Sequence, residues 1–262
     1  MSLPDTDRII LYDIPSTVGS WGPNTWKTRL ALNYKGITYR TEWVEFPDIE
    51  PLLSARSVAP NLPQLAPWPY TLPAIYDPRT KKTIMDSYNI AAYLDETYPD
   101  TPPLLPPKTR VFEAAFLHVF MDAVQKHLLT IMLNSISQKL NPRSQKYFRE
   151  SREAARGITL EEVSPAGSEK RAEQFATLER GFDALASWFD AAGDGRLLLS
   201  GGGPDGDATK VSQADMVIAG VFIWVRIVVG EDSEEWRALE SYGGGRWLRH
   251  LAFFEKWADA SN

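Results

Sequence analysis

Two short segments contain residue types that could hold the ends of a zwitterionic ligand. Leu72-Pro73 starts an apolar run expected to be a strand, where proline cannot donate a hydrogen bond to the sheet. A cis proline there would leave the N–H and C=O of Leu72 free to pair with an extended ligand, although an edge-strand proline is the simpler explanation. Asp86-Ser87 opens a predicted helix, where free amides and the Ser87 hydroxyl suit a carboxylate and Asp86 suits an ammonium. The pair fits an α-amino acid head group, or serves only as a helix cap.

A third segment, Ser20–Lys27 (SWGPNTWK), joins a predicted strand to a predicted helix that begins at Pro23. Free amides at a helix N-terminus, with hydroxyls nearby, stabilise an anion and lower the pKa of a thiol placed there. A purely structural loop is the competing interpretation.

The composition removes several kinds of chemistry. There is no cysteine and only three isolated histidines, which excludes disulfides, thiolate metal sites and a cysteine nucleophile of the protein's own, and predicts no metal site. The 28 basic and 34 acidic residues give a net charge of −6, and the basic residues form no stripe, so no nucleic-acid partner is expected. No secretory signal is visible at the start, which predicts a cytoplasmic protein.

The elements that would position these segments fall into two halves. The order expected for residues 1–99 is strand, helix, strand, a long proline-rich loop (46–71), two strands and a helix. Residues 100–108 contain four prolines and are expected to be a linker. Residues 109–262 have helical periodicity, with an irregular insertion expected at 135–168.

Within that second half, one helix start is well marked. Ser212 and Asp215 have nearly the spacing and chemistry of a capping box, and they precede the apolar run Met216–Gly230. That run contains Arg226 and is too short to span a bilayer, so it predicts a buried helix and no membrane partner.

The order of these motifs resembles a cytosolic glutathione transferase over nearly the whole chain, from about Arg8 to Trp257. TWKTRLALNYKGITYRTEWVEF and MDSYNIAAYLDETYP look most like the fungal etherase-related (Fu-type) enzymes, which are similar to bacterial β-aryl-etherases. The resemblance implies an α+β fold, with a thioredoxin-like N-terminal domain followed by an all-α domain. It also implies glutathione as cofactor, hydrophobic aromatic or phenolic ligands and a homodimer.

By position, the resemblance assigns the γ-glutamyl group of glutathione to Asp86 and Ser87, and the cysteinyl main chain to Leu72 beside cis Pro73. Arg56 and Gln64 are the candidates for the glycyl carboxylate.

The catalytic position departs from the pattern of the family. Related proteins have serine or cysteine immediately before the proline of the first helix, and this chain has Gly22. A missing hydroxyl removes a hydrogen bond to the thiolate, so slow conjugation is expected. Asn24 is ranked first as a substitute donor, followed by Ser20 and Thr25.

The apolar ligand is expected between the loop 16–21 and the first helix of the second half. Its predicted contacts are Trp21, Phe116, Phe120 and Met121, and for the last three plain core packing is at least an equal alternative. A weakly active or non-catalytic ligandin that binds polyphenols is the second hypothesis, and a regulatory protein on the same fold is the third.

Overall fold

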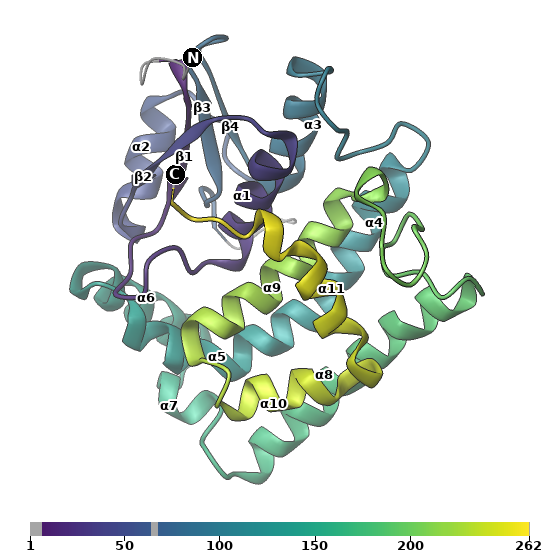
Figure 1. Ribbon diagram of the computed structural model, residues 1–262. Helices are drawn as coiled ribbons and strands as arrows, with labels where there is room; N and C mark the ends of the chain where they lie inside the picture. Colours follow the sequence, from purple (N-terminus) through teal and green to yellow (C-terminus); the bar gives the residue numbers. More distant parts are fainter. Residues whose placement is uncertain (1–6, 64–67, 262) are drawn as a thin grey trace.

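The computed structural model describes residues 7–63 and 68–261. A small part built of strands and helices lies against a larger part built of helices alone (Figure 1). The predicted α+β fold, a thioredoxin-like domain followed by a helical domain, is confirmed.

The sheet has four strands in the order β2-β1-β3-β4. β1 pairs parallel with β2, and β3 is antiparallel to both β1 and β4. The strands are β1 (Ile9–Asp13), β2 (Tyr39–Trp43), β3 (Ala74–Asp77) and β4 (Lys82–Met85). Because β3 lies inside the sheet, the edge-strand explanation of Pro73 is wrong. The Leu72–Pro73 peptide bond is cis.

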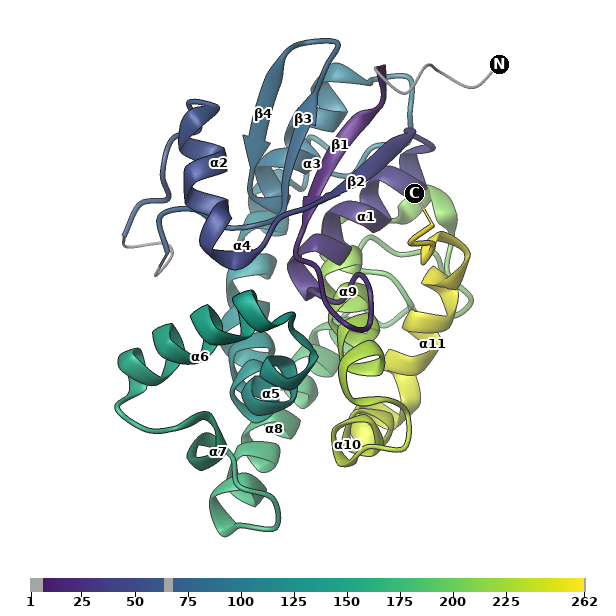
Figure 2. The ribbon, with the colours of Figure 1, turned by 90° about the vertical axis from the view of Figure 1, so that its left-hand side faces the viewer.

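Three helices cover this sheet. α1 (Pro23–Lys35) and α3 (Ser87–Thr97) lie on one face and α2 (Ile49–Ala55) on the other (Figures 1 and 2). The expected loop 46–71 therefore contains a helix that the sequence reading missed. Pro51 falls in the first turn of α2, where the N–H that proline lacks has no partner inside the helix, so this proline does not prevent a helix.

Buried charges hold α1 in place. Arg29 Nη2 lies 3.0 Å from Asp13 Oδ2 at the end of β1, and both side chains are fully buried. Lys35 Nζ lies 2.8 Å from Asp95 Oδ1 of α3. The Asp95 carboxylate also accepts hydrogen bonds from the N–H groups of Leu104 and Leu105, so the chain between the two halves is fixed to α1 and α3.

The second half is helical throughout. Its helices are α4 (Arg110–Phe120), α5 (Lys126–Lys139), α6 (Pro142–Arg156), α7 (Leu160–Val163), α8 (Glu169–Ala191), α9 (Gln213–Val229), α10 (Glu234–Ser241) and α11 (Arg246–Phe254). The expected irregular insertion at 135–168 is wrong, because most of it is α6, α7 and the end of α5. Its polar composition reflects how much of α6 faces solvent.

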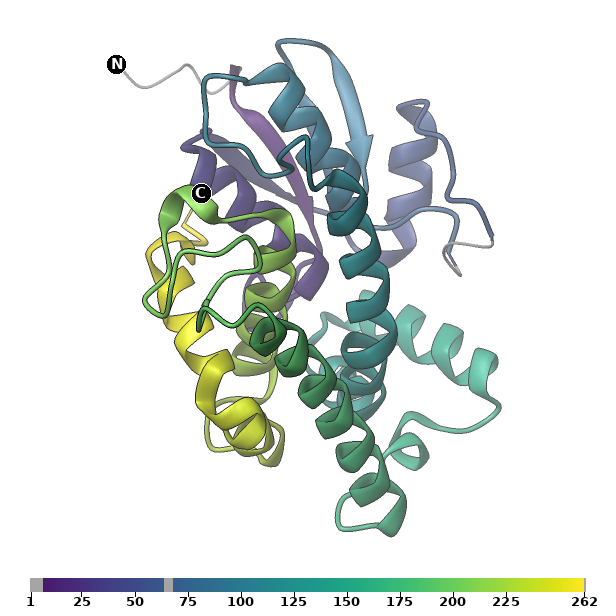
Figure 3. The ribbon, with the colours of Figure 1, turned by 90° about the vertical axis from the view of Figure 1, so that its right-hand side faces the viewer.

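The most buried helix is α9, which α1, α4, α5, α10 and α11 contact (Figures 1 and 3). As expected, Met216–Gly230 forms a buried helix. Within 7–63 and 68–261, no helix is long and apolar enough to cross a membrane.

A π-helical turn at Met121–Gln125 joins α4 to α5. α8 approaches this turn so closely that a Cβ at Gly181 would lie 2.1 Å from the carbonyl oxygen of Ala123. Only glycine fits there without moving the turn. α4, this turn and α5 thus form one long helix with a wider turn in the middle, and such turns are frequent at functional sites.

Candidate functional site

The N-terminus of α1 has no side-chain cap. Gly22 precedes it with extended backbone (φ −66°, ψ 131°), and Pro23 has no N–H. The N–H groups of Asn24 and Thr25 have no acceptor among the described residues. Two amides at the positive end of a helix dipole are thus available for an anion.

The three catalytic candidates differ in how free their side chains are. Thr25 is buried, and its Oγ1 donates to the carbonyl of Gly22 at 3.0 Å. Ser20 is also buried, and its carbonyl accepts from the indole of Trp26. Asn24 is partly exposed, and its Nδ2 has no acceptor among the described residues. The geometry therefore favours Asn24 as the side-chain donor.

Lys27 and Gln125 hold the oxygen of the Asn24 side-chain amide. Asn24 Oδ1 accepts from Lys27 Nζ at 2.8 Å and from Gln125 Nε2 at 3.0 Å. Lys27 Nζ donates in addition to Gln125 Oε1 at 3.0 Å and contacts Met121 Sδ at 3.8 Å. The sequence analysis missed Lys27 and Gln125, because the bonds between them join positions 98 residues apart.

Lys27 is a buried cation, 1% exposed, and no carboxylate within the described part of the chain lies at ion-pair distance from it. Burial lowers the pKa of Lys27 to about 8, while the negative charge of Asp86 acts in the opposite direction. α1 and α3 also contact each other, so one ligand that spans both helix starts stays a prediction.

The second part of that site is the junction of β3 and α3. The N–H of Asp86 donates to the carbonyl of Pro73 at 3.1 Å, which places the start of α3 beside the cis bond. The N–H and C=O of Leu72 have no partner among the described residues. The main chain of Leu72 is therefore available to an extended ligand.

Asp86 acts as a cap and still has capacity for a ligand. Its Oδ1 accepts from the N–H groups of Tyr88 (2.9 Å) and Asn89 (3.2 Å), while its Oδ2 makes no hydrogen bond to the described residues. Its φ of +80° is uncommon for a residue other than glycine. Ser87, buried beside it, begins α3. The cap is confirmed, and the ligand role of Asp86 and Ser87 stays a prediction that the cap does not exclude.

The candidates for the glycyl carboxylate are less well placed by the structure. The Arg56 guanidinium lies over the rings of Tyr76 (4.7 Å) and Tyr12 (5.4 Å), at the end of α2. Gln64 lies outside the described residues. The role of both side chains stays a prediction.

The four residues predicted to contact the apolar ligand do not share one cavity. Trp21 is buried, and its indole N–H has no acceptor among the described residues. Phe120 is fully buried and stacks on Phe116 at 6.0 Å. Met121 is 38% exposed and faces α1, whereas Phe116 contacts Trp188 of α8 at 6.4 Å. Phe116 and Met121 therefore lie on different sides of the same long helix.

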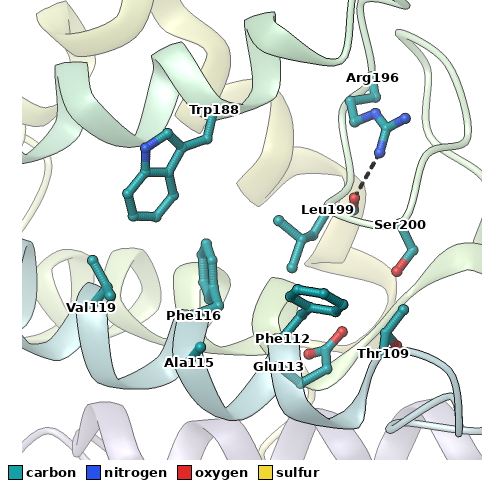
Figure 4. Close-up of a pocket in the computed structure, with 10 residues that line it drawn as sticks. All are labelled: Thr109, Phe112, Glu113, Ala115, Phe116, Val119, Trp188, Arg196, Leu199 and Ser200. Atoms are coloured by element: carbon teal, nitrogen blue, oxygen red, sulfur yellow. Dashed lines mark hydrogen bonds between the residues drawn. The ribbon is translucent and has the colours of Figure 1, made fainter.

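A pocket of about 550 Å³ lies on the α8 side of α4 (Figure 4). Phe112, Phe116 and Trp188 supply its aromatic surface, and Trp188 projects from α8 toward Phe116. The full lining is Thr109, Phe112, Glu113, Ala115, Phe116, Val119, Trp188, Arg196, Leu199 and Ser200. The helical spacing of Phe112, Phe116 and Val119 indicates that they share one face of a helix. Nothing in the sequence indicates that Trp188 lies opposite them.

One acid at the base of this pocket is buried. Glu113 Oε2 accepts from the N–H of Ala214 in α9 at 2.9 Å. Burial raises the pKa of Glu113 to about 7, with a further contribution from Asp215, against the effect of the Ala214 hydrogen bond. The carboxyl group is therefore partly protonated near neutral pH.

Comparison with known proteins identifies the family. The models described as glutathione S-transferase N-terminal domain and C-terminal domain match residues 21–97 and 111–257. The chain is 45% identical to a glutathione S-transferase of Ceriporiopsis subvermispora crystallised in complex with glutathione, covering 97% of this chain and 99% of that one, with a TM-score of 0.89.

Two further relatives agree with this result. The glutathione transferase GSTFuA3 from Phanerochaete chrysosporium is 41% identical over 100% of both chains, with a TM-score of 0.86. The glutathione S-transferase-like protein ustS of Aspergillus flavus is 30% identical over 95% of this chain and 92% of its own length. The predicted resemblance is confirmed: the chain belongs to the glutathione S-transferase family.

Proposed function

We propose that this protein is a cytoplasmic transferase that joins glutathione to hydrophobic aromatic electrophiles of the plant-phenolic kind, in detoxification. The observation that carries the proposal is the open N-terminus of α1, where two amides and the Asn24 side chain offer donors that no described residue uses. An anionic sulfur is the ligand that such a group of donors stabilises.

The rest of glutathione fits the residues around this end of α1. Asp86 Oδ2 is free to accept from the γ-glutamyl ammonium, and the start of α3 with Ser87 suits its carboxylate. The unpaired main chain of Leu72 suits the cysteinyl N–H and C=O. We keep Arg56 and Gln64 as the candidates for the glycyl carboxylate.

Glutathione supplies the nucleophile: its thiol loses a proton to water, sulfur bonds to the electrophilic carbon, and the leaving group departs with the electron pair. The chain lowers the thiol pKa and holds the reactants together. Since Gly22 has no hydroxyl, Asn24 and the amides of α1 perform the first task alone.

The test is conjugation of an activated aryl halide. Asn24→Ala is expected to lower kcat/KM about 10- to 100-fold, as the loss of one hydrogen bond to a charged group predicts. Thr25→Ala is the matched control in the same turn and is expected to change kcat/KM less than threefold. Full activity in Asn24→Ala would contradict the role of Asn24. No turnover in the unsubstituted protein, despite tight glutathione binding, would contradict the transferase proposal.

The pocket between α4 and α8 supports a second candidate function, a ligandin that binds polyphenols. Its aromatic wall of Phe112, Phe116 and Trp188 suits a flat phenolic ring. Quenching of tryptophan fluorescence by a hydroxylated biphenyl would measure binding, with Trp188→Phe as the variant. Equal affinity with and without glutathione, and lower affinity in Trp188→Phe, would support this function.

We also propose a homodimer. Val111, at the start of α4, is 79% exposed, and we take this apolar side chain as a contact with the partner subunit. Sedimentation should give twice the mass of the chain, and Val111→Ser should weaken the dimer. A monomer for the unsubstituted protein at micromolar concentration would contradict this proposal.

A further inference from the structure

Lys27 stands out because it buries a charge without an opposite charge to pair with. Its ammonium is surrounded by neutral acceptors, namely the amide oxygens of Asn24 and Gln125 and the sulfur of Met121. Its stem is also enclosed, since a Cβ at Gly220 of α9 would lie 3.5 Å from Lys27 Cγ. Burying an ammonium in this way costs stability, so a role beyond packing is indicated.

The contacts show what the ammonium does to its neighbours. An ammonium has three donors and no acceptor, so the atom of Asn24 that faces it must be the oxygen. Gln125 donates its Nε2 to the same Asn24 oxygen, while its own Oε1 faces Lys27. One positive charge therefore sets the orientation of both amides.

The consequence appears at the opposite side of the Asn24 amide. With Oδ1 accepting two hydrogen bonds, both of its lone pairs are used. The Nδ2 group, which has no acceptor among the described residues, is then the part of the amide left for a ligand at the N-terminus of α1. If the amide were reversed, the same space would face an oxygen, which repels an anion.

We propose that Lys27 is a positioning residue, which holds the Asn24 amide so that its N–H donors, and not its oxygen, face the glutathione sulfur. The inference rests on the proposed function. Lys27 acts through Asn24, and Gln125 supports it from the π-helical turn of the other half.

The test measures the pKa of the bound glutathione thiol from the ultraviolet absorbance of the thiolate. The protein has no cysteine, so the thiolate signal belongs to glutathione alone. Lys27→Met should raise that pKa by about 1 to 2 units, the equivalent of one hydrogen bond to a charged group, with a much smaller change in glutathione affinity. Asn24→Ala should raise it by a similar amount.

A double-mutant cycle separates positioning from simple charge. If Lys27 acts through Asn24, Lys27→Met should have little further effect in the Asn24→Ala background. Additive effects of the two substitutions would overturn the inference, because they would show that the lysine charge acts directly on the sulfur. An unchanged thiol pKa in Lys27→Met would overturn it as well.

Lys27→Gln is a second variant for the case that Lys27→Met does not fold. Its side-chain amide can hydrogen-bond to Asn24 and Gln125 in either orientation of their amides. Like Lys27→Met, Lys27→Gln should raise the pKa of the bound glutathione thiol. In the glutathione-free protein, NMR of the Asn24 side-chain amide should show one fixed orientation, and exchange between two in Lys27→Gln.

Failure of the proposed function gives a different pattern. If Asn24→Ala binds glutathione with an unchanged thiol pKa, both the role of Asn24 and the inference fall. If Asn24→Ala raises the thiol pKa and both lysine variants leave it unchanged, only the inference falls.

Discussion

α1 and α9 pack against each other, yet the free amides at their N-termini are treated in opposite ways. At α9 every first-turn N–H is used: Gln213 donates to the Leu104 carbonyl (2.9 Å), Ala214 to Glu113 (2.9 Å), and Asp215 to the Ser212 hydroxyl. At α1 the N–H groups of Asn24 and Thr25 have no acceptor among the described residues. One helix start is completed by the protein, and the other leaves two amides free for a ligand.

The contrast shows how to tell a structural helix start from a binding one. The sequence shows the local pair Ser212 and Asp215 at the start of α9, but it does not show how many amides of either first turn find an acceptor. The difference lies in whether distant residues, such as Leu104 and Glu113, supply acceptors. The start of α3 is intermediate, because Asp86 caps it with one oxygen and keeps the other free.

The largest effect on stability should come from removing Asp215 at the N-terminus of α9. Asp215→Ala removes the acceptor for the N–H groups of Ser212 and Leu199 inside the core. We expect the free energy of unfolding to fall by about 2–4 kcal/mol, measured by urea denaturation. Asp215→Asn keeps one of the two acceptor oxygens and should cost less than Asp215→Ala. A changed thiol pKa of bound glutathione in the folded variant would contradict the distinction between the two starts.

Next in size is Asp86, where the two roles can be separated. Asp86→Asn keeps a good cap and tolerates the positive φ, but loses the charge. It should weaken glutathione binding about 10-fold or more, measured by calorimetry, with a change in stability below about 0.5 kcal/mol. Asp86→Gly is the control that relieves the backbone conformation and removes both roles. If Asp86→Asn binds glutathione as tightly as the unsubstituted protein, Asp86 is a cap alone.

A smaller effect depends on pH. The pKa of Glu113 is raised to about 7 from 4.5, so between these values the folded state binds more protons than the unfolded state. Stability contributed by this group is therefore lost as pH rises from 5 to about 7, on the order of 2–3 kcal/mol. Glu113→Gln, which keeps an acceptor for Ala214, should flatten that part of the stability curve. If the free energy of unfolding changes with pH in the same way in Glu113→Gln and in the unsubstituted protein, Glu113 is ionised over this whole pH range.

The smallest effect tests the uncapped N-terminus of α1. Gly22→Ser adds a hydroxyl next to the uncapped start of α1, at a backbone conformation that any residue can adopt. Its Cβ would lie 3.0 Å from Thr25 Oγ1, so Thr25 must rotate slightly. The thiol pKa should fall by about 1 unit, and conjugation should rise several-fold. Gly22→Ala controls for the crowding. Equal effects of serine and alanine would argue against a new hydrogen bond.

Much of the fold and the ligand-facing main chain was predictable from local patterns. Leu72-Pro73, Asp86-Ser87 and the box of Ser212 with Asp215 are each encoded within four residues, and the structure has the cis bond, the cap and the box. The helix α2 was missed because six prolines in that stretch masked its short apolar pattern.

The remainder depends on contacts between distant segments. Nothing near Asn24 indicates that Gln125 will approach it, or that Trp188 will face Phe116, because those contacts arise only when α1, α4 and α8 pack. The buried state of Lys27 is equally invisible, since lysine one turn into a helix is usually solvated. Sequence therefore located the candidate donors but not the side chains that orient them.

The π-helical turn at Met121–Gln125 limits how freely the two halves can be recombined. Although the strands and helices of the first half form the glutathione side, the acceptors that hold Lys27 include side chains of this turn. A chimera that exchanges the second half for that of another transferase must bring residues 121 and 125 together with 24 and 27. Without residues 121 and 125 in place, Lys27 would be buried without two of its acceptors.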